Sequence, residues 1–271
     1  MRHPIIRRPI ARRIAAAAAL SVPLAMAASA VPASAHPVDG PVSVRLDPLK
    51  GSDASGTATL TPTSNGGLTV SIHDTGLVPN MPHAQHIHGD TSGKHFYCPS
   101  ASADKNRDGF ISVEEGLPMY GNIHISLTTK GDTSMKSALA VDRMPVADAN
   151  GNLDYHRTLT SAELPKGTLA NLTRLHIVQH GVDANDNNKY DLKGLGESTF
   201  AKSAGVKGIP EEATDGATCG MIMPAGSVNT GGTSTAGVDH PYAIGAGFAG
   251  LIAAGGLMII RRRTNQSHRQ G

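Results

Sequence analysis

The sequence predicts an all-β fold, either an antiparallel sandwich or a Greek-key barrel, on three observations. Short segments alternate apolar and polar side chains, as strands with one buried face do. Clusters of Gly, Asn, Asp and Ser separate these segments at the positions where turns are needed. Residues 36–225 show hardly any apolar repeat with the period of a helix, so long amphipathic helices are not expected.

The expected strands follow one another along the chain. Residues 42–46 alternate, and residues 58–61 and 68–72 flank a Ser-Asn-Gly-Gly turn, which indicates a hairpin. Further strands are expected at 122–127, 139–146, 153–159 and 175–180. The Asp-Ala-Asn-Gly-Asn turn at 148–152 would join two of them into a second hairpin. Seven or eight short strands without an internal repeat are typical of a sandwich or barrel.

The first 35 residues have the three parts of a secretory signal peptide. A basic stretch with four arginines leads, residues 14–27 are apolar, and Ala33-Ser34-Ala35 is a site of the kind that signal peptidase cleaves. The alternative, a membrane helix kept in the mature protein, is disfavoured because the apolar run is short and Pro23 interrupts it.

The other end of the chain predicts a membrane anchor. Residues 242–260 are apolar and uncharged, long enough to nearly span a hydrocarbon core of about 30 Å. Three arginines follow at once, so residues 261–271 are expected to be a basic cytoplasmic tail. Residues 226–241 are rich in Gly, Ser and Thr, which is typical of a flexible stalk. The alternatives are a buried core helix and a wall-sorting tail, although the usual Leu-Pro-x-Thr-Gly pentad of such tails is missing.

This organisation places a β domain at residues 36–225 outside the cytoplasm, on the cell membrane. Residues 36–240 carry 15 basic and 22 acidic side chains, a net charge of −7 with neutral histidines, whereas the whole chain is +2. An acidic surface repels phosphate, so no nucleic-acid partner is expected. The membrane is the expected partner, and the sequence does not identify a protein partner.

Residues 104–115 match the twelve-residue calcium loop of EF-hands. Gly109 stands where the loop turns sharply, and calcium prefers six to eight oxygen ligands such as this loop supplies. The alternative is an acidic surface turn that binds nothing. Gly116 and Pro118 are expected to stop the helix that follows, so we predict a structural site rather than a sensor. The predicted ligands are Asp104, Asn106, Asp108, Phe110 through its carbonyl, Ser112 and Glu115.

A second, weaker loop follows later in the chain. Its oxygen-bearing side chains keep the same spacing, and Asn188 tolerates the left-handed conformation that the sixth position needs. Gly194 stands at the twelfth position, so the bidentate carboxylate is missing unless Glu197 supplies it. A turn without metal is an equal alternative. The candidate ligands are Asp183, Asn185, Asn187 and Asp191.

Histidines cluster at two places in the expected strands. His86 and His88 are two residues apart, so a strand directs both imidazoles to one face, and His176 and His180 also share a face. Imidazole clusters suit copper or zinc. Polar strand residues that face solvent are the alternative. The two cysteines are both on the expected outer side, where close thiols oxidise, and two free buried thiols are the alternative.

The segment from Pro82 to Gly89 resembles the histidine signature of CHRD-domain proteins and the His-x-His segment of copper/zinc superoxide dismutases. Residues 176–183 are similar to the late His-Gly segment of the dismutases, and residues 219–222 to their last strand with its Cys-Gly pair. The matches keep their order over roughly residues 42–224.

The resemblance implies an eight-stranded, superoxide dismutase-like Greek-key barrel with a bond between Cys98 and Cys219. It implies copper ligands at His86, His88 and His180, with His95 in the place of the bridging imidazole. Two departures are clear, since the zinc loop is replaced by the calcium-type loop and no arginine shortly precedes Cys219.

Together these features predict a membrane-anchored, extracytoplasmic calcium-binding β-domain protein that is not an enzyme, with Ca²⁺ as its cofactor. The alternatives are a copper-dependent, superoxide dismutase-like oxidoreductase and a copper-binding protein at the cell surface, each with Cu²⁺.

Overall fold

The structure is a computed structural model, and it describes residues 40–223. The predicted signal peptide (1–35), stalk (226–241), membrane helix (242–260) and basic tail (261–271) lie outside the described residues. Within residues 40–223, no helix is long and apolar enough to cross a membrane.

Eight antiparallel strands form one sheet in the order β5-β4-β7-β8-β1-β2-β3-β6. Neighbours that are distant in the chain, such as β4 with β7 and β1 with β8, show that long connections cross the sheet. The strands are β1 (Val42–Pro48), β2 (Ser55–Pro62), β3 (Leu68–Thr75), β4 (Gln85–His88), β5 (Ile123–Ser126), β6 (Leu153–Leu159), β7 (His176–His180) and β8 (Gly216–Met221). The predicted all-β antiparallel class is confirmed.

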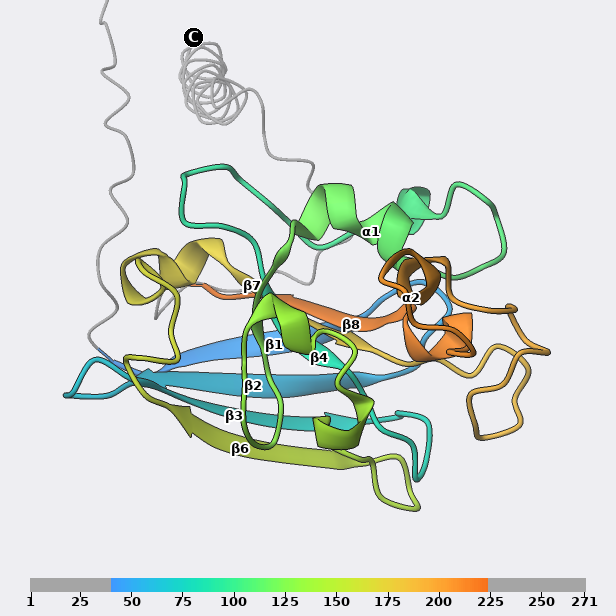
Figure 1. The fold of residues 1–271 in the computed structure, drawn as a ribbon, viewed down its shortest axis with the longest axis horizontal. Coiled ribbons are helices and arrows are strands. Elements are labelled where there is room, and N and C mark those ends of the chain that lie inside the picture. The colour runs from blue at the N-terminus through green and yellow to red at the C-terminus, as the bar shows by residue number, and fades with distance from the viewer. Residues whose placement is uncertain (1–39, 224–271) are drawn as a thin grey trace, which may run out of the picture. The chain divides into compact units, whose positions relative to one another are not determined.

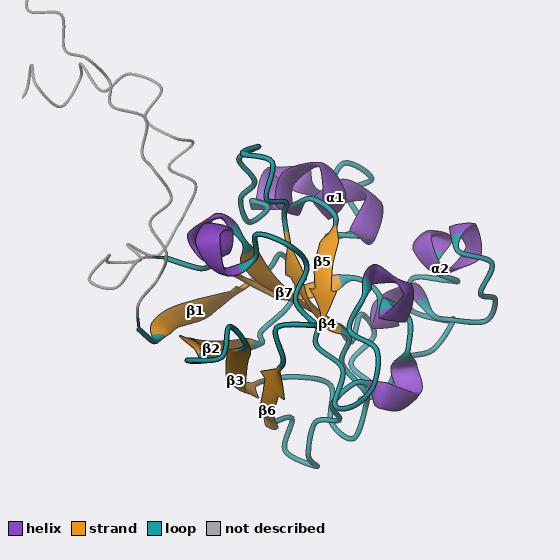
Figure 2. Ribbon diagram, turned by 60° about the vertical axis from the view of Figure 1, so that its left-hand side comes forward, coloured by secondary structure: helices purple, strands orange, loops and turns teal. Residues whose placement is uncertain are grey.

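The sheet curls so that its two edge strands come within reach of each other. In Figure 2, β1, β2, β3 and β6 form one wall, and β4, β5 and β7 lie across from it. The hydroxyl of Tyr155 in β6 donates to the carbonyl of Thr128, just after β5, at 3.1 Å, and Arg157 donates to the same carbonyl at 2.8 Å. Among the described strands, no backbone ladder joins β5 to β6, so side chains bridge the gap between these two edges. The sheet is therefore a half-barrel.

Alternation along the strands fills the inside of this curl. Val42, Val44 and Leu46 of β1 are buried, with their neighbours exposed, and β3 repeats the pattern at Leu68 and Val70. These side chains belong to one apolar core shared by both walls. Burying such side chains contributes roughly 1.5–3 kcal/mol each, which explains why the pairing register is well determined.

The inner face of β3 ends on a buried carboxyl group. Asp74 is fully buried, and neither of its side-chain oxygens has a hydrogen-bond partner in the described structure. It packs against Gly56, where a Cβ atom would lie 1.7 Å from Oδ1 of Asp74. Burial raises the pKa of Asp74 to about 7, although the nearby Gln179 side chain opposes the rise.

Most strands match their predicted positions, but residues 139–146 do not form a strand. Residues 141–143 form a 3₁₀ turn, and only Val146 pairs, in an isolated bridge with Pro82. Pro145 has no N–H to give to a ladder. Backbone bonds within the segment, such as Arg143 N–H to the Ala140 carbonyl at 2.8 Å, use three of its other donors.

Helices are short and lie outside the sheet (Figure 1). The prediction that Gly116 and Pro118 stop the helix after the calcium-type loop was wrong. Ser112 and Glu115 form a capping box that starts this helix, and Pro118 lies inside it. The helices are α1 (Val113–Tyr120) and α2 (Thr199–Ser203), with 3₁₀ turns η1 (Ala101–Ala103), η2 (Met135–Ser137), η3 (Val141–Arg143), η4 (Leu169–Arg174) and η5 (Glu211–Ala213).

A disulfide joins Cys98 to Cys219, with their Cα atoms 5.7 Å apart. The pairing implied by the family resemblance is confirmed. It ties the long segment before α1 to β8 and closes a loop with a sequence separation of 121 residues. In the chain-entropy model such a loop stabilises the fold by roughly 4–5 kcal/mol.

Candidate metal centre

Three buried histidines meet on the outer face of the sheet. His86 and His88 lie two residues apart on β4, so both point outward, and Ile87 between them enters the core. His180 ends β7, which pairs with β4. The side chains are 2–4% exposed, and the ring centroids are 5.3–6.1 Å apart. We call His86, His88 and His180 the histidine cluster.

Local irregularities in the ladders occur at two members of this cluster. The β4–β5 register shifts between Ile87 and His88, and the β7–β8 register shifts between Gln179 and His180. A bulge turns the strand locally and re-aims the side chain beside it. The directions of these imidazole rings therefore depend on the register shifts as well as on the alternation of side chains along the strands.

Each imidazole is held by a backbone carbonyl. Nε2 of His86 lies 3.2 Å from the Ala138 oxygen, Nδ1 of His88 lies 2.8 Å from the Gly121 oxygen, and Nδ1 of His180 lies 2.6 Å from the Thr214 oxygen. A carbonyl can only accept, so these ring nitrogens carry the protons.

The second nitrogen of each ring therefore carries a lone pair that is available to a metal. For His86 this is Nδ1, and for His88 it is Nε2; both are buried and have no hydrogen-bond partner among the described residues. For His180 it is Nε2. A buried polar atom without a partner is unfavourable unless a ligand satisfies it, so these atoms point to a bound ion.

Burial keeps the three rings neutral. It lowers the pKa of His88 to about 3 and that of His180 to about 4. The pKa of His86 is lowered well below its usual value, first by burial and then by its two histidine neighbours. Neutral imidazole is the form that binds metals, so protons do not compete at ordinary pH.

The spacing of the cluster fits one ion. Ring nitrogens, one from each histidine, lie within 4.8 Å of one another. Three nitrogens bound to the same copper or zinc ion at about 2.0–2.1 Å are about 3.3–3.6 Å apart. Binding therefore requires the ring nitrogens to approach one another by up to about 1.5 Å, through rotation of the side chains. The donor set therefore fits a metal that accepts imidazole.

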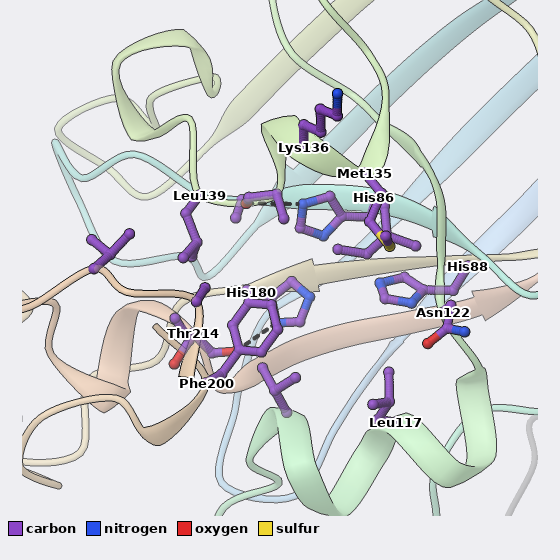
Figure 3. Close-up of a pocket in the computed structure, with 16 residues that line it drawn as sticks. His86, His88, Leu117, Asn122, Met135, Lys136, Leu139, His180, Phe200 and Thr214 are labelled. Carbon is purple, nitrogen blue, oxygen red and sulfur yellow. Dashed lines mark hydrogen bonds between the residues drawn. The ribbon is translucent and has the colours of Figure 1, made fainter. Parts of the chain in front are cut away.

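The cluster forms the floor of a cavity of about 380 Å³. Figure 3 shows the three rings facing this space, with Leu117, Leu139 and Phe200 around it. None of the described residues that line it carries a carboxylate, and Lys136 is the one side chain among them with a full charge at neutral pH. The wall is chiefly apolar, which limits water near the ring nitrogens.

The structure does not bring His95 to this cluster. His95 is exposed, on the segment between β4 and η1. His176, which the spacing in the sequence puts on the same face as His180, is the cross-strand partner of His88. It is buried with both ring nitrogens unpartnered, yet it is not part of the group that converges on one point.

The first calcium-type loop (residues 104–115) turns its carboxylates inward. Asp104 accepts from the backbone N–H of Arg107 at 2.6 Å and of Gly109 at 3.1 Å. Glu115 accepts from the N–H groups of Lys105 at 2.7 Å and Ser112 at 3.1 Å. The predicted first and twelfth ligands thus face the same interior, although the loop's oxygens are bonded to its own donors.

Lys50 reaches this loop from outside it. Its ammonium group contacts Oδ2 of Asp104 and, through this hydrogen bond, holds the pKa of the carboxyl below its usual value. The side chain of Asp108 accepts from the Asn106 amide at 2.7 Å. A calcium ion in the loop would have to replace the Lys50 ammonium at Asp104.

The second loop (residues 183–194) receives a carboxylate from a distant part of the chain. Glu212 is fully buried, and it accepts from Ala184 N–H at 3.0 Å and Asp191 N–H at 2.7 Å. These are the second and ninth positions, from which Glu115 also accepts in the first loop. Glu197, the carboxylate considered from the sequence, instead accepts from Gly208 N–H at 2.6 Å.

Sequence reasoning missed Glu212 because nothing near residue 194 indicates it. Asp183 accepts from the N–H groups of Asn187 at 3.0 Å and Asn188 at 2.6 Å, and Asn188 has the expected left-handed conformation, with φ of 61°. Gly194 is the one sign in the sequence, because a glycine at the twelfth position leaves room for a side chain from elsewhere. A Cβ atom at Gly194 would lie 2.1 Å from Oε1 of Glu212.

Short segments connect both loops to the histidine cluster. Helix α1 starts inside the first loop and ends at Tyr120, and the carbonyl of the next residue, Gly121, holds His88. Glu212, which completes the second loop, is two residues from Thr214, whose carbonyl holds His180. Two of the three imidazoles are therefore oriented by segments that the loops position.

No family model matches the chain, and no curated protein matches it. Among solved structures, the chain is similar to a double mutant of a SOD-like protein from Bacillus subtilis, at 12% identity and a TM-score of 0.34, over 67% of this chain and 96% of that one. It is also similar to superoxide dismutase 5 of Candida albicans with Cu(II), at 16% identity and a TM-score of 0.34, over 72% and 100%. Likeness at this level does not say which residues of the chain act, so the histidine cluster is interpreted from its own geometry.

Proposed function

We propose that this chain is a copper-binding protein whose metal is held by His86, His88 and His180. One observation carries the proposal: three buried imidazoles, each held by a carbonyl through one ring nitrogen, bring one nitrogen from each ring within 4.8 Å of the other two. Copper, when bound, would supply one-electron chemistry. The chain's own residues orient the rings, keep them neutral and exclude water.

Copper is favoured over other ions by the donor set. Calcium and magnesium require oxygen ligands, and the described lining of the cavity includes no carboxylate. Among divalent first-row ions, copper has the highest affinity for imidazole sites, above zinc. The ordered tautomers add to this, because fixing the ring orientation before binding lowers the entropy that binding must overcome.

Binding rather than superoxide removal is the function that the cavity supports. A superoxide enzyme gains from a positive field that draws the anion to the metal. Here Lys136 is the one cationic side chain that lines the cavity in the described structure, and residues 36–240 are acidic overall.

The test uses the full-length chain, purified and freed of metal. We expect one tightly bound copper per chain by metal analysis after dialysis. The triple variant His86→Gln/His88→Gln/His180→Gln should bind none, and His95→Gln, which changes an exposed histidine, should bind as the natural chain does. Far-UV circular dichroism of each variant separates loss of the site from loss of the fold. Equal copper in the triple variant and the natural chain would refute the proposal.

Calcium binding in the two loops is a second, structural role that we propose. In each loop two carboxylates face one interior, and calcium would bring further oxygens to them. Melting temperature should rise with calcium in the natural chain and rise less in Glu115→Gln. A full response in that variant would exclude the first loop.

We also propose that the domain works outside the cytoplasm on a membrane anchor, from residues 1–35 and 242–263 of the sequence. A chain truncated after Gly237 should appear in the medium. If the truncated chain stays with the cells as the full chain does, the anchor is misassigned.

A further inference from the structure

Met135 is the sulfur-bearing side chain of the cavity. Of the described residues that line the space above the histidine cluster, it alone contains sulfur. In the view of Figure 3, its sulfur, drawn in yellow, projects toward the gap between the rings of His86 and His88. It is the first residue of η2, three positions before Ala138, whose carbonyl holds His86.

The backbone at this point is firmly placed. The Ser134 side chain accepts from Lys136 N–H at 3.3 Å and so begins the 3₁₀ turn. Ser137 donates to Asp132 at 2.6 Å, and Arg143 donates to Ser137 at 2.9 Å. The start of the Met135 side chain is therefore held at the cavity mouth, while its own rotatable bonds leave the sulfur free to adjust.

Packing does not explain a methionine here. Met135 is 59% exposed, so it contributes little to the apolar core. It lines the same cavity as ring nitrogens that have no partner, and its flexible side chain suits a ligand atom that moves onto an ion. A thioether is a soft, neutral donor, and soft sulfur donors select Cu(I) over harder ions.

The charge of the ion also favours Cu(I) over Cu(II). Imidazole binds a metal in its neutral form, and the wall of the cavity is chiefly apolar, with Lys136 as the one charged side chain among the described lining residues. The energy of placing an ion in such surroundings grows with the square of its charge, so Cu(II) is penalised about four times as much as Cu(I). No described carboxylate lines the cavity to offset the second charge.

We propose that Met135 is the fourth ligand of the metal held by the histidine cluster, and that this set of three nitrogens and one sulfur makes the site bind Cu(I) in preference to Cu(II). The inference rests on the proposed copper site and adds the identity of its fourth donor and the oxidation state it favours.

The experiment measures both oxidation states on the full-length chain. Cu(I) affinity is measured without oxygen by competition with a coloured Cu(I) chelator, and Cu(II) affinity in air by competition with an amino-acid chelator. Met135→Leu keeps the size and apolar character of the side chain but has no sulfur. We expect Cu(I) affinity to fall at least tenfold in this variant and Cu(II) affinity to change less than threefold. Met221→Leu, which removes an exposed methionine of β8 outside the cavity, should change neither.

Copper X-ray absorption gives a readout of the ligands themselves. The natural chain loaded with Cu(I) should show a sulfur neighbour that is absent in Met135→Leu. A spectrum with nitrogen neighbours alone, or equal Cu(I) affinity in the two proteins, would overturn the inference and leave the three-histidine site standing. Absence of copper from the natural chain would instead refute the proposed function and this inference with it. Equal melting temperatures of the two metal-free proteins are expected, because Met135 is largely exposed.

Discussion

The histidine cluster and the first loop are two candidate cation sites built on opposite principles. The cluster is buried, neutral and apolar around its edges, and at least two of its ring nitrogens have no partner in the described structure. The loop is mostly exposed and charged, and its carboxylates are already bonded to the loop's own N–H groups and to Lys50.

The difference shows how each site would respond to its ion. Ligands of the cluster stay in place because the sheet and three carbonyls hold them, so an ion gains affinity without displacing anything. Ligands of the loop already satisfy one another, so an ion must replace existing bonds and gains only the difference. We therefore expect tight binding at the cluster and weaker, mainly stabilising binding at the loop.

Removal of one cluster ligand should have the largest effect. His180→Gln deletes a metal-binding nitrogen, and loss of an outer partner alone typically lowers affinity 10- to 100-fold, so about a thousandfold loss of copper affinity is expected. Competition with a copper chelator measures it. The calcium-dependent rise in melting temperature should be unchanged in this variant; its disappearance would show that the two sites are one unit.

Asp74 tests whether buried ionisable side chains other than the histidines are also neutral in the folded protein. The pKa of Asp74 is raised to about 7 by burial, so the folded protein keeps its proton while the unfolded chain loses it above about pH 4. The contribution of Asp74 to stability should therefore fall as pH rises from about 4 to 7 and level off above. Asp74→Asn removes this dependence and should gain on the natural chain by on the order of 2 to 4 kcal/mol over that range. Urea unfolding at pH 4, 5.5 and 7 is the measurement, and a constant difference between the two proteins would contradict the expectation.

In the second loop, the carboxylate that arrives from a distant part of the chain, Glu212, is buried. Glu212→Gln weakens two hydrogen bonds from Ala184 and Asp191, and a loss of roughly 1–3 kcal/mol in unfolding free energy is expected. Glu197→Gln is the control, because that side chain bonds elsewhere. Calcium should stabilise the Glu212 variant less than the control, and equal stabilisation would remove Glu212 from the loop's site.

The smallest effect is expected at Lys50. Its ammonium occupies Asp104, which a calcium ion needs, so Lys50→Met should raise calcium affinity about three- to tenfold. Calorimetric titration of the full chain measures it. Copper affinity should not change. A lower calcium affinity in Lys50→Met would show that Lys50 supports the loop rather than competing for it.

Much of the fold could be predicted because it depends on local patterns. Alternation of apolar and polar residues identifies the buried faces of β1, β3 and β6, and the Ser-Asn-Gly-Gly turn identifies the β2–β3 hairpin. The same reasoning failed at residues 139–146, where an apolar stretch with a proline forms turns. It also failed at Pro118, which lies inside α1, a helix that begins with a capping box.

The candidate site was predicted only in part. Period-two spacing placed His86 and His88 on one face, and the family resemblance added His180, but His95 does not join them. The spacing of residues says which face a side chain occupies, and it says nothing about how far apart two segments will lie once the sheet curls.

Most of the strand pattern, the two Asx-rich loops and the pair of histidines on β4 can be inferred from the sequence, because each depends on residues close together in the chain. The carbonyls that hold each ring, the contact of Glu212 with the second loop and the place of Met135 in the cavity wall depend on tertiary contacts. These contacts join segments far apart in the chain, and the packing of one apolar core, rather than any local preference, brings them together.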